Sequence, residues 1–137
     1  MIGRILLVEG DPALGAVLVE ALRHSGYEVI FVRTLLGKVE RFDSFDSLSA
    51  VILDIDTTSP EKELVWLGVL QPYDELLPIV LMGLQVPQEL CRRLRLHLGP
   101  QQTNVLTMLK KPFRNGELLA AVRQAQESSL PRHATEK

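Results

Sequence analysis

The chain has 137 residues, which is enough for one ordinary domain and too few for two. Hydrophobic residues make up 46% and charged residues 23%, and 15 Lys plus Arg stand against 17 Asp plus Glu, a balance typical of a globular protein. This near-neutral charge argues against non-specific binding to nucleic acid or to a membrane surface, because either needs a basic excess.

The cysteine content and the apolar stretches indicate a reducing compartment. Cys91 is the one cysteine of the sequence and cannot form an internal disulfide. No cationic segment followed by an apolar run opens the chain, as a secretory signal would. The longest apolar stretches fall far short of the roughly 20 residues that cross a bilayer. We therefore expect a cytoplasmic protein with no membrane span.

Apolar runs of strand length alternate with stretches of helical period, and Gly, Pro, Asp or Asn punctuates the changes. This alternation is typical of β–α units around a parallel sheet. The first strand is predicted at residues 4–8, where the apolar run lacks polar alternation, as in a strand buried on both faces. A helix ended by Gly26 follows, and its apolar stripe is Leu14, Val17, Leu18, Ala21 and Leu22.

The rest of the chain continues the alternation. Further strands are predicted at 29–32, 50–53, 78–82 and 105–109, and helices at 35–42, 61–70, 88–98 and 117–126. The inward positions of the last three helices are Leu64, Leu67 and Val69 or Leu70, then Leu90, Cys91, Leu94 and Leu98, then Leu118, Leu119, Val122 and Ala125. Because crossovers between parallel strands are right-handed, we predict a doubly wound α/β fold with strand order 2-1-3-4-5. One domain spans 1–126, and the polar residues 127–137 are predicted to form a tail or linker.

Charged residues follow three of the predicted strands at the point where each ends. The first strand leads into Glu9, Gly10 and Asp11, the third into Asp54 and Asp56, the fourth into Gly83, and the fifth into Lys110 and Lys111. Ligand sites of open parallel sheets lie beyond the carboxyl ends of the strands, so we expect these residues to share one crevice. Crowded carboxylates raise one another's pKa, which predicts Lys111 or Mg²⁺ among them.

Four segments, in this order, resemble the receiver domain of bacterial response regulators: ILLVEGDP, VILDID, LPIVLMG and LKKPF. The resemblance extends to about residue 126 and implies a flavodoxin-like (CheY-like) five-stranded fold. It implies that Asp54 accepts a phosphoryl group from a sensor histidine kinase, that Glu9 is one of two adjacent acids holding Mg²⁺, and that Lys111 is the lysine preceding a proline. The Lys111–Pro112 bond is then a candidate cis peptide.

The sequence departs from the receiver pattern at two site positions. Gly10 stands where the second metal-binding acid is expected, and Gly83 where a Ser or Thr senses the phosphoryl group. Phosphoryl transfer depends on positioning and on neutralising the charge of the phosphoryl oxygens, so these losses remove parts of the machinery. With Glu9 and Asp54, and Asp11 reaching back, we expect at most a weak Mg²⁺ site.

We therefore predict an atypical receiver that is not an enzyme and signals by protein contact or dimerisation, with phosphorylation of Asp54 impaired or absent. The alternative is a working phosphoacceptor receiver in a phosphorelay that uses Asp54. A flavodoxin-like enzyme or nucleotide binder lacks support, because no Gly-rich phosphate loop, nucleophile elbow or triad pattern is present.

Several of the candidate site residues have two possible roles. Asp11 precedes Pro12 and can cap a helix, or it can bind a metal ion. Glu9 can belong to the pocket or be a solvated loop acid, and Asp54 can be a phosphoacceptor or only begin a loop. For Lys111 we favour an ion pair with Asp54.

The sequence also suggests partners. YDELLPIVLMG followed by PQELCRRLR resembles the amino-terminal receivers of enhancer-binding transcription activators, particularly flagellar regulators, whose pocket is similarly incomplete. That resemblance implies downstream ATPase and DNA-binding domains. We predict a homodimer through the helix 88–98, the edge strand 105–109 and the helix 117–126. Arg92, Arg93, Arg95 and Leu96 lie off the buried stripe of the first of these helices.

Overall fold

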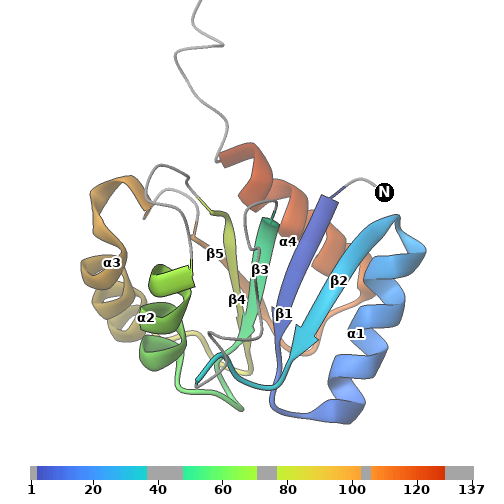
Figure 1. Cartoon of the computed structure of the whole chain (residues 1–137), viewed down its shortest axis with the longest axis horizontal. Coiled ribbons are helices and arrows are strands. Elements are labelled where there is room, and N and C mark those ends of the chain that lie inside the picture. Colours follow the sequence, from blue (N-terminus) through green and yellow to red (C-terminus); the bar gives the residue numbers. More distant parts are fainter. Residues whose placement is uncertain (1–2, 37–47, 71–76, 103–105, 129–137) are drawn as a thin grey trace, which may run out of the picture.

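The computed structural model of the chain describes residues 3–36, 48–70, 77–102 and 106–128 (Figure 1). The strands are β1 (Gly3–Val8), β2 (Tyr27–Val32), β3 (Leu48–Asp54), β4 (Ile79–Gly83) and β5 (Leu106–Lys110). The helices are α1 (Pro12–His24), α2 (Pro60–Leu70), α3 (Gln88–Gln102) and α4 (Asn115–Ser128).

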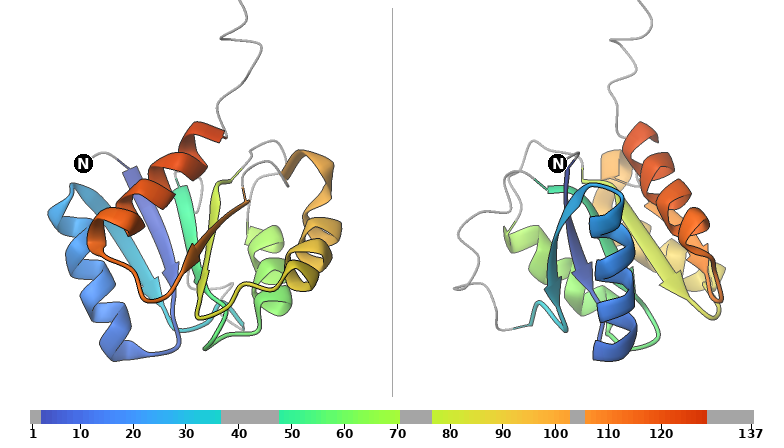
Figure 2. Two further views of the ribbon diagram at one scale, coloured as in Figure 1. Left: turned by 180° about the vertical axis from the view of Figure 1, so that it is seen from behind. Right: turned by 90° about the vertical axis from the view of Figure 1, so that its right-hand side faces the viewer.

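The strands form one parallel sheet in the order β2-β1-β3-β4-β5, which confirms the predicted topology. Helices cover both faces of the sheet: α1 and α4 lie on one side, and α2 and α3 on the other (Figures 1 and 2). The three central strands are therefore buried on both faces, which explains why their sequences are continuously apolar.

An apolar layer fills the space on each side of the sheet. Against α1 and α4 the sheet contributes Ile5, Leu7, Ala50, Ile52, Val80 and Met82. Against α2 and α3 it contributes Leu6, Val8, Val51, Leu53, Ile79 and Leu81. Because alternate residues of each strand point to opposite faces, one strand serves both layers. Burying each of these aliphatic side chains contributes about 1.5–3 kcal/mol. The two layers fix the strand ends relative to one another.

The predicted stripe of α1 is wrong at Val17, whose side chain is 59% exposed. Leu18 and Leu22 are buried, as predicted, and Gly15 is buried with them. A Cβ atom added at Gly15 would lie 2.1 Å from Cζ of Phe31, so only glycine lets the helix lie against this ring. The buried side of α1 thus carries Gly15, Leu18 and Leu22, and Val17 lies outside it.

Several predicted boundaries differ from the structure. Strands β2 and β3 each begin two residues earlier than predicted, α1 begins at Pro12, and α4 runs from Asn115 to Ser128 rather than over 117–126. Leu35 and Leu36 are not helical, and the rest of the predicted helix 35–42 lies outside the described residues. The structure does not describe the side chains of four predicted inward positions, Leu67, Val69, Leu70 and Leu98. Residues 103–105 and the tail residues 129–137 lie outside the described ranges.

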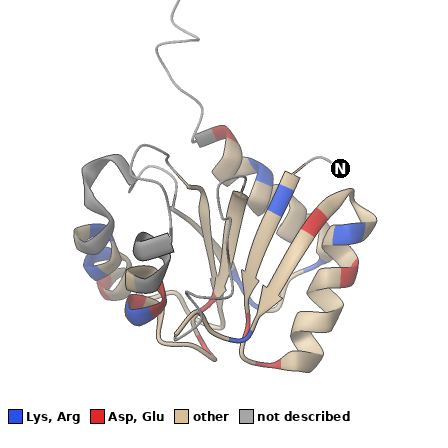
Figure 3. Cartoon of the chain, in the orientation of Figure 1, with Lys and Arg blue, Asp and Glu red and all other residues tan. Residues whose placement is uncertain are grey.

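Positions of Lys and Arg alternate with positions of Asp and Glu over the described helices and strands (Figure 3). None of the described helices has the length and apolar character needed to cross a membrane.

Candidate functional site

The carboxyl ends of β1, β3 and β5 bring together Glu9, Asp54 and Lys111. Asp54 is the last residue of β3, and its side chain is fully buried. Lys111 follows β5, and its Nζ donates a hydrogen bond to Oδ2 of Asp54, so the predicted ion pair is present. The backbone N–H of Lys111 donates to the carbonyl oxygen of Gly83 at 2.8 Å, which fixes the lysine beside β4. The Lys111–Pro112 bond is cis, as predicted.

Both carboxylate oxygens of Asp54 accept hydrogen bonds from the protein. Oδ1 accepts from the backbone N–H groups of Asp56, at 2.7 Å, and Thr57, at 3.1 Å, while Oδ2 accepts from Lys111. Burial opposes ionisation, but the neighbouring Glu9 carboxyl group and the hydrogen bonds from Lys111 and the Asp56 backbone N–H hold the pKa of Asp54 below its usual range. Asp54 is thus an ionised, buried carboxylate.

Glu9 is also fully buried and belongs to this pocket, so it is not a solvated loop acid. Its Oε1 accepts hydrogen bonds from the backbone N–H of Asp11 at 3.0 Å and the hydroxyl of Thr57 at 3.2 Å. Within the described part of the chain, its Oε2 has no partner. Burial and the neighbouring Asp54 raise the pKa of Glu9 to about 7. Below that pH, Glu9 carries a proton that it can donate to Asp54.

The exposed side chain of Asp11 caps helix α1. Its Oδ1 accepts from the backbone N–H of Ala13 at 3.0 Å and of Leu14 at 3.4 Å, and Pro12 is the first helical residue. The side chain satisfies N–H groups that otherwise have no partner at a helix start. The capping interpretation of Asp11 is confirmed.

Replacing Asp11 by alanine is expected to lower the free energy of unfolding by about 1 kcal/mol, because the cap is lost. Asp11→Asn keeps an oxygen acceptor and is expected to retain most of the stability. Urea denaturation of the three proteins measures the difference. A stability unchanged in Asp11→Ala would contradict the capping role.

The spaces that open at Gly10 and Gly83 are occupied by residues that follow β3. A Cβ atom added at Gly10 would lie 2.8 Å from the carbonyl oxygen and 2.9 Å from Cβ of Thr57. A Cβ atom added at Gly83 would lie 2.6 Å from Cγ1 of Ile55 and 3.1 Å from Oδ1 of Asp56. Neither a second acid nor a hydroxyl side chain fits unless the segment 55–57 moves.

Thr57 is a site residue that no sequence pattern identifies. Its Oγ1 accepts a hydrogen bond from the backbone N–H of Gly10 at 2.9 Å and donates one to Glu9. It thereby links the ends of β1 and β3 from the side on which the second acid is missing. This contact depends on the missing side chain at Gly10, so sequence spacing alone gives no indication of it.

The search of family models and the search of curated proteins found no match to this sequence. Solved structures with the same fold are numerous. The non-phosphorylated HemR receiver domain from Leptospira biflexa is 26% identical, with a TM-score of 0.68 over 95% of this chain and 97% of that one. The signal receiver domain of a LuxO repressor protein from Vibrio parahaemolyticus is 18% identical, with a TM-score of 0.70 over 100% and 99%.

A third neighbour is the receiver domain of a sensor histidine kinase from Pseudomonas aeruginosa. It is 23% identical, with a TM-score of 0.67 over 91% of this chain and 98% of that one. The chain has the receiver-domain fold. The structure of the kinase receiver contains a magnesium ion coordinated in its active-site cleft. The receiver fold thus makes Mg²⁺ the metal ion to test against the residues present here.

The donor set of this receiver fold does not fit Mg²⁺. Of the four carboxyl oxygens of Glu9 and Asp54, all but Oε2 of Glu9 accept hydrogen bonds from the protein. Lys111 already neutralises Asp54, and Asp11, the third predicted ligand, caps α1. Mg²⁺ requires several oxygen ligands in octahedral arrangement, whereas among the described residues Glu9 and Asp54 leave only Oε2 of Glu9 without a partner, on a carboxyl group whose pKa is raised. No cluster of three or more metal-binding side chains occurs among the described residues.

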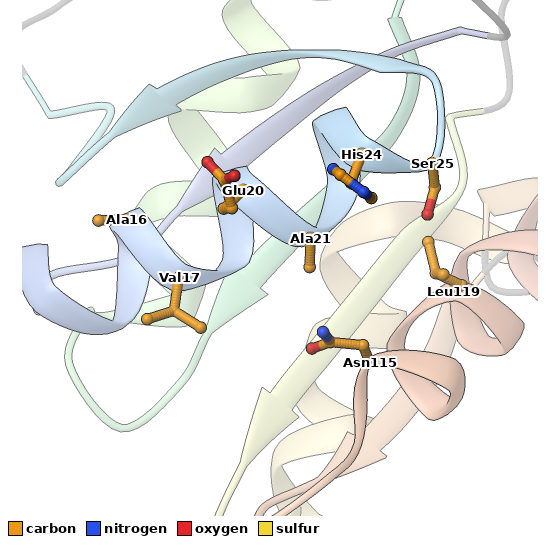
Figure 4. A pocket seen from close by; sticks show the side chains of 8 residues that line it. All are labelled: Ala16, Val17, Glu20, Ala21, His24, Ser25, Asn115 and Leu119. Atoms are coloured by element: carbon orange, nitrogen blue, oxygen red, sulfur yellow. The ribbon is translucent and has the colours of Figure 1, made fainter.

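Two apolar hollows flank the start of α4 on this receiver fold. One, of about 520 Å³, lies beside Lys111 and is lined mainly by Leu14, Val17, Leu18, Leu84, Pro112 and Phe113. The other, of about 620 Å³, lies between α1 and α4 (Figure 4). Figure 4 shows Val17 and Ala21 of α1 and Leu119 of α4 around it, with Glu20 and His24 along its border. Neither hollow contains a cluster of catalytic side chains.

Proposed function

We propose that this protein is an atypical receiver domain that signals through protein contacts, with phosphorylation of Asp54 impaired or absent. The proposal treats the domain as a binding module rather than an enzyme. It rests on the receiver fold and on the chemistry of the pocket at the carboxyl ends of β1, β3 and β5.

The state of Asp54 is the observation that carries this proposal. Its side chain is fully buried, and both oxygens already accept hydrogen bonds from Lys111 and from backbone N–H groups. A phosphodonor needs an exposed oxygen on this carboxylate, together with cationic groups around the transferred phosphoryl. Among the described residues, Lys111 is the cation that contacts Asp54, and it is paired with the acceptor itself.

Intact-mass measurement tests the proposal directly. We expect no phosphoryl adduct when the wild-type protein is incubated with acetyl phosphate and Mg²⁺, because Asp54 is enclosed and the metal site is incomplete. A known active receiver treated in parallel shows that the phosphodonor works. A stoichiometric adduct on the wild type that is lost in Asp54→Asn would contradict the proposal.

The alternative function is a working receiver that accepts a phosphoryl group on Asp54 from a sensor histidine kinase. One observation favours it: Asp54 and Lys111 end β3 and β5 side by side, in a fold shared with a receiver whose cleft holds Mg²⁺. The same mass measurement separates the two functions, because only the alternative gives an adduct.

We further propose that the partner is a second copy of the chain, bound through α3, β5 and α4. Strand β5 is the edge of the sheet, and Met108 on it is 40% exposed. Leu96 of α3 is 73% exposed, beside a helix face that also carries the exposed Arg92 and Arg93. An edge strand flanked by exposed apolar side chains is a surface that association can cover.

The double substitution Leu96→Glu with Met108→Glu is expected to weaken this dimer at least about tenfold, because it places like charges across a two-fold interface. Sedimentation velocity over a range of concentrations measures the association. Leu36→Glu is the matched control, since Leu36 is 37% exposed and follows β2, the strand at the opposite edge of the sheet from β5. A wild type that remains monomeric at high concentration would rule out the dimer.

The sequence similarity to receivers of enhancer-binding activators leads us to propose that this domain regulates ATPase and DNA-binding domains in a longer protein. Contact with those domains would use the surface formed by α3, β5 and α4. The domain itself would not bind nucleic acid. Titration of the domain with duplex DNA is expected to give no binding at physiological salt, consistent with its near-neutral charge.

A further inference from the structure

Asp56, two residues beyond Asp54, has a carboxylate that crosses from the end of β3 to the ends of β4 and β5. Its Oδ2 accepts a hydrogen bond from the backbone N–H of Leu84 at 3.0 Å and lies 3.3 Å from Nζ of Lys111. Its Oδ1 lies 3.1 Å from the position that a Cβ atom of residue 83 would take. The sequence indicated that Asp56 belongs to the acidic crevice, but not that it spans it.

These contacts place an anion where a group attached to Asp54 would have to lie. Lys111 Nζ interacts with both Oδ2 of Asp54 and Oδ2 of Asp56, so the two carboxylates share one cation. A phosphoryl group on Oδ2 of Asp54 would project toward the same lysine and toward the backbone N–H of Leu84, which donates to Asp56. A cationic amine and a backbone amide are the kinds of donor that stabilise phosphoryl groups in proteins.

The anion is held in position by local structure. The backbone N–H of Asp56 donates to Oδ1 of Asp54 at 2.7 Å, and this hydrogen bond fixes Asp56 next to Asp54. Ile55, directly before it, donates its backbone N–H to the carbonyl oxygen of Met82 at 2.9 Å, which keeps the segment against β4. The small residue at Gly83 leaves the space through which Ile55 and Asp56 reach.

We propose that Asp56 is a built-in anion that takes the place of a phosphoryl group on Asp54 and holds the β4–α3 connection in one conformation without phosphorylation. The proposal rests on the proposed function, a receiver fold that signals without a phosphoryl group, and gives that function a physical basis. Lys111 and Leu84 are then engaged permanently, and the surface that begins at Leu84 and continues into α3 keeps one conformation.

Amide hydrogen exchange at Leu84, followed by NMR, tests the proposal. Asp56→Ala is expected to speed exchange of the Leu84 amide at least about tenfold, because a hydrogen bond to a charged acceptor is lost. Asp56→Asn keeps an oxygen acceptor for this amide and is expected to retain most of the protection. Amides of β1 and β3 serve as the internal control for global folding in each variant.

A second experiment tests whether an added oxyanion binds where the Asp56 carboxylate lies in the wild type. The side chain is 28% exposed, so solvent reaches this place. Inorganic phosphate or formate is expected to shift and protect the Leu84 amide saturably in Asp56→Ala and not in the wild type, with chloride at equal ionic strength as control. Unchanged Leu84 exchange in Asp56→Ala, no rescue by either anion, or an equal response in the wild type would overturn the proposal.

These outcomes are separable from those of the proposed function. The mass of the wild type after phosphodonor treatment concerns Asp54, whereas the Leu84 amide concerns Asp56. A phosphoryl adduct would therefore refute the proposed function, and an unresponsive Leu84 amide would refute the role of Asp56, each by its own measurement.

Discussion

Replacing Lys111 by methionine is expected to lower the free energy of unfolding by about 3 kcal/mol near neutral pH. The methionine keeps the apolar stem of the lysine but leaves Asp54, which is fully buried, without its cation. Removing one member of a buried ion pair costs about 3–5 kcal/mol, because the remaining charge is uncompensated. We place the effect at the lower end, since the Lys111 side chain is 14% exposed and water can reach the site.

Two further variants identify the cause of this loss. Lys110→Met changes the neighbouring exposed lysine of β5 and is expected to alter stability by no more than about 0.5 kcal/mol. Adding Asp54→Asn to Lys111→Met removes the uncompensated charge and is expected to recover most of the stability. Urea denaturation at one pH measures all four proteins. If Lys111→Met were as stable as the wild type, the ion pair would not hold the strand ends together.

Replacing Glu9 by glutamine is expected to stabilise the protein at about pH 8 and to have little effect at about pH 5. Burial raises the pKa of Glu9 from 4.5 to about 7, so the folded state keeps a proton that the unfolded chain has released. The stability provided by this proton is complete below pH 4.5 and is lost as the pH rises through 7. Because one pKa unit corresponds to about 1.4 kcal/mol, the difference reaches at most about 3 kcal/mol.

The pH profile of unfolding distinguishes this effect from ordinary surface charge. Glu20→Gln changes an exposed glutamate of α1 and is expected to follow the wild-type profile. The pKa of Asp54 is lowered, so its contribution is present above its unfolded pKa of 3.8 and is lost as the pH falls below that value. The two acids therefore act in different pH windows. A Glu9→Gln variant that gained no stability between pH 5 and pH 8 would show that Glu9 is ionised in the folded protein.

The ion pair and the sheet order were predictable from the sequence, because both follow from where apolar strands end. Asp54 directly follows the apolar run of β3, and Lys111 lies just beyond that of β5, with only Lys110 between. The parallel order of the sheet then places their side chains on one edge. The Asp11 cap was equally local, since an acid before proline specifies a helix start.

The contacts that close the pocket were not predictable in the same way. The positions of Asp56 and Thr57 depend on the conformation of the loop after β3 and on the space left by two glycines. Glu63 was also missed: it is 2% exposed on α2 and accepts a hydrogen bond from the backbone N–H of Leu35 at 2.7 Å. Its partner lies 28 positions away along the chain, so helical period alone cannot indicate that this acid is buried.

Val17 shows the limit of the hydrophobic stripe. The period of α1 places Val17 with Leu18 and Leu22, but the side of the helix against the ring of Phe31 is the one that carries Gly15, and Val17 is exposed. The rotation of a helix about its own axis depends on the shape of the surface that it packs against as well as on the positions of its apolar residues.

We propose that side chains of this receiver fold fill the pocket in which a phosphoryl group on Asp54 would lie. The most direct test is the amide NMR spectrum of the wild type during titration with Mg²⁺ and beryllofluoride, a mimic of a phosphoryl group on aspartate. We predict no saturable change at Asp54, Asp56, Leu84 or Lys111, because Asp56 already occupies the donors that the mimic would use. Saturable shifts of these amides that disappear in Asp54→Asn would contradict the claim and establish a working phosphoacceptor.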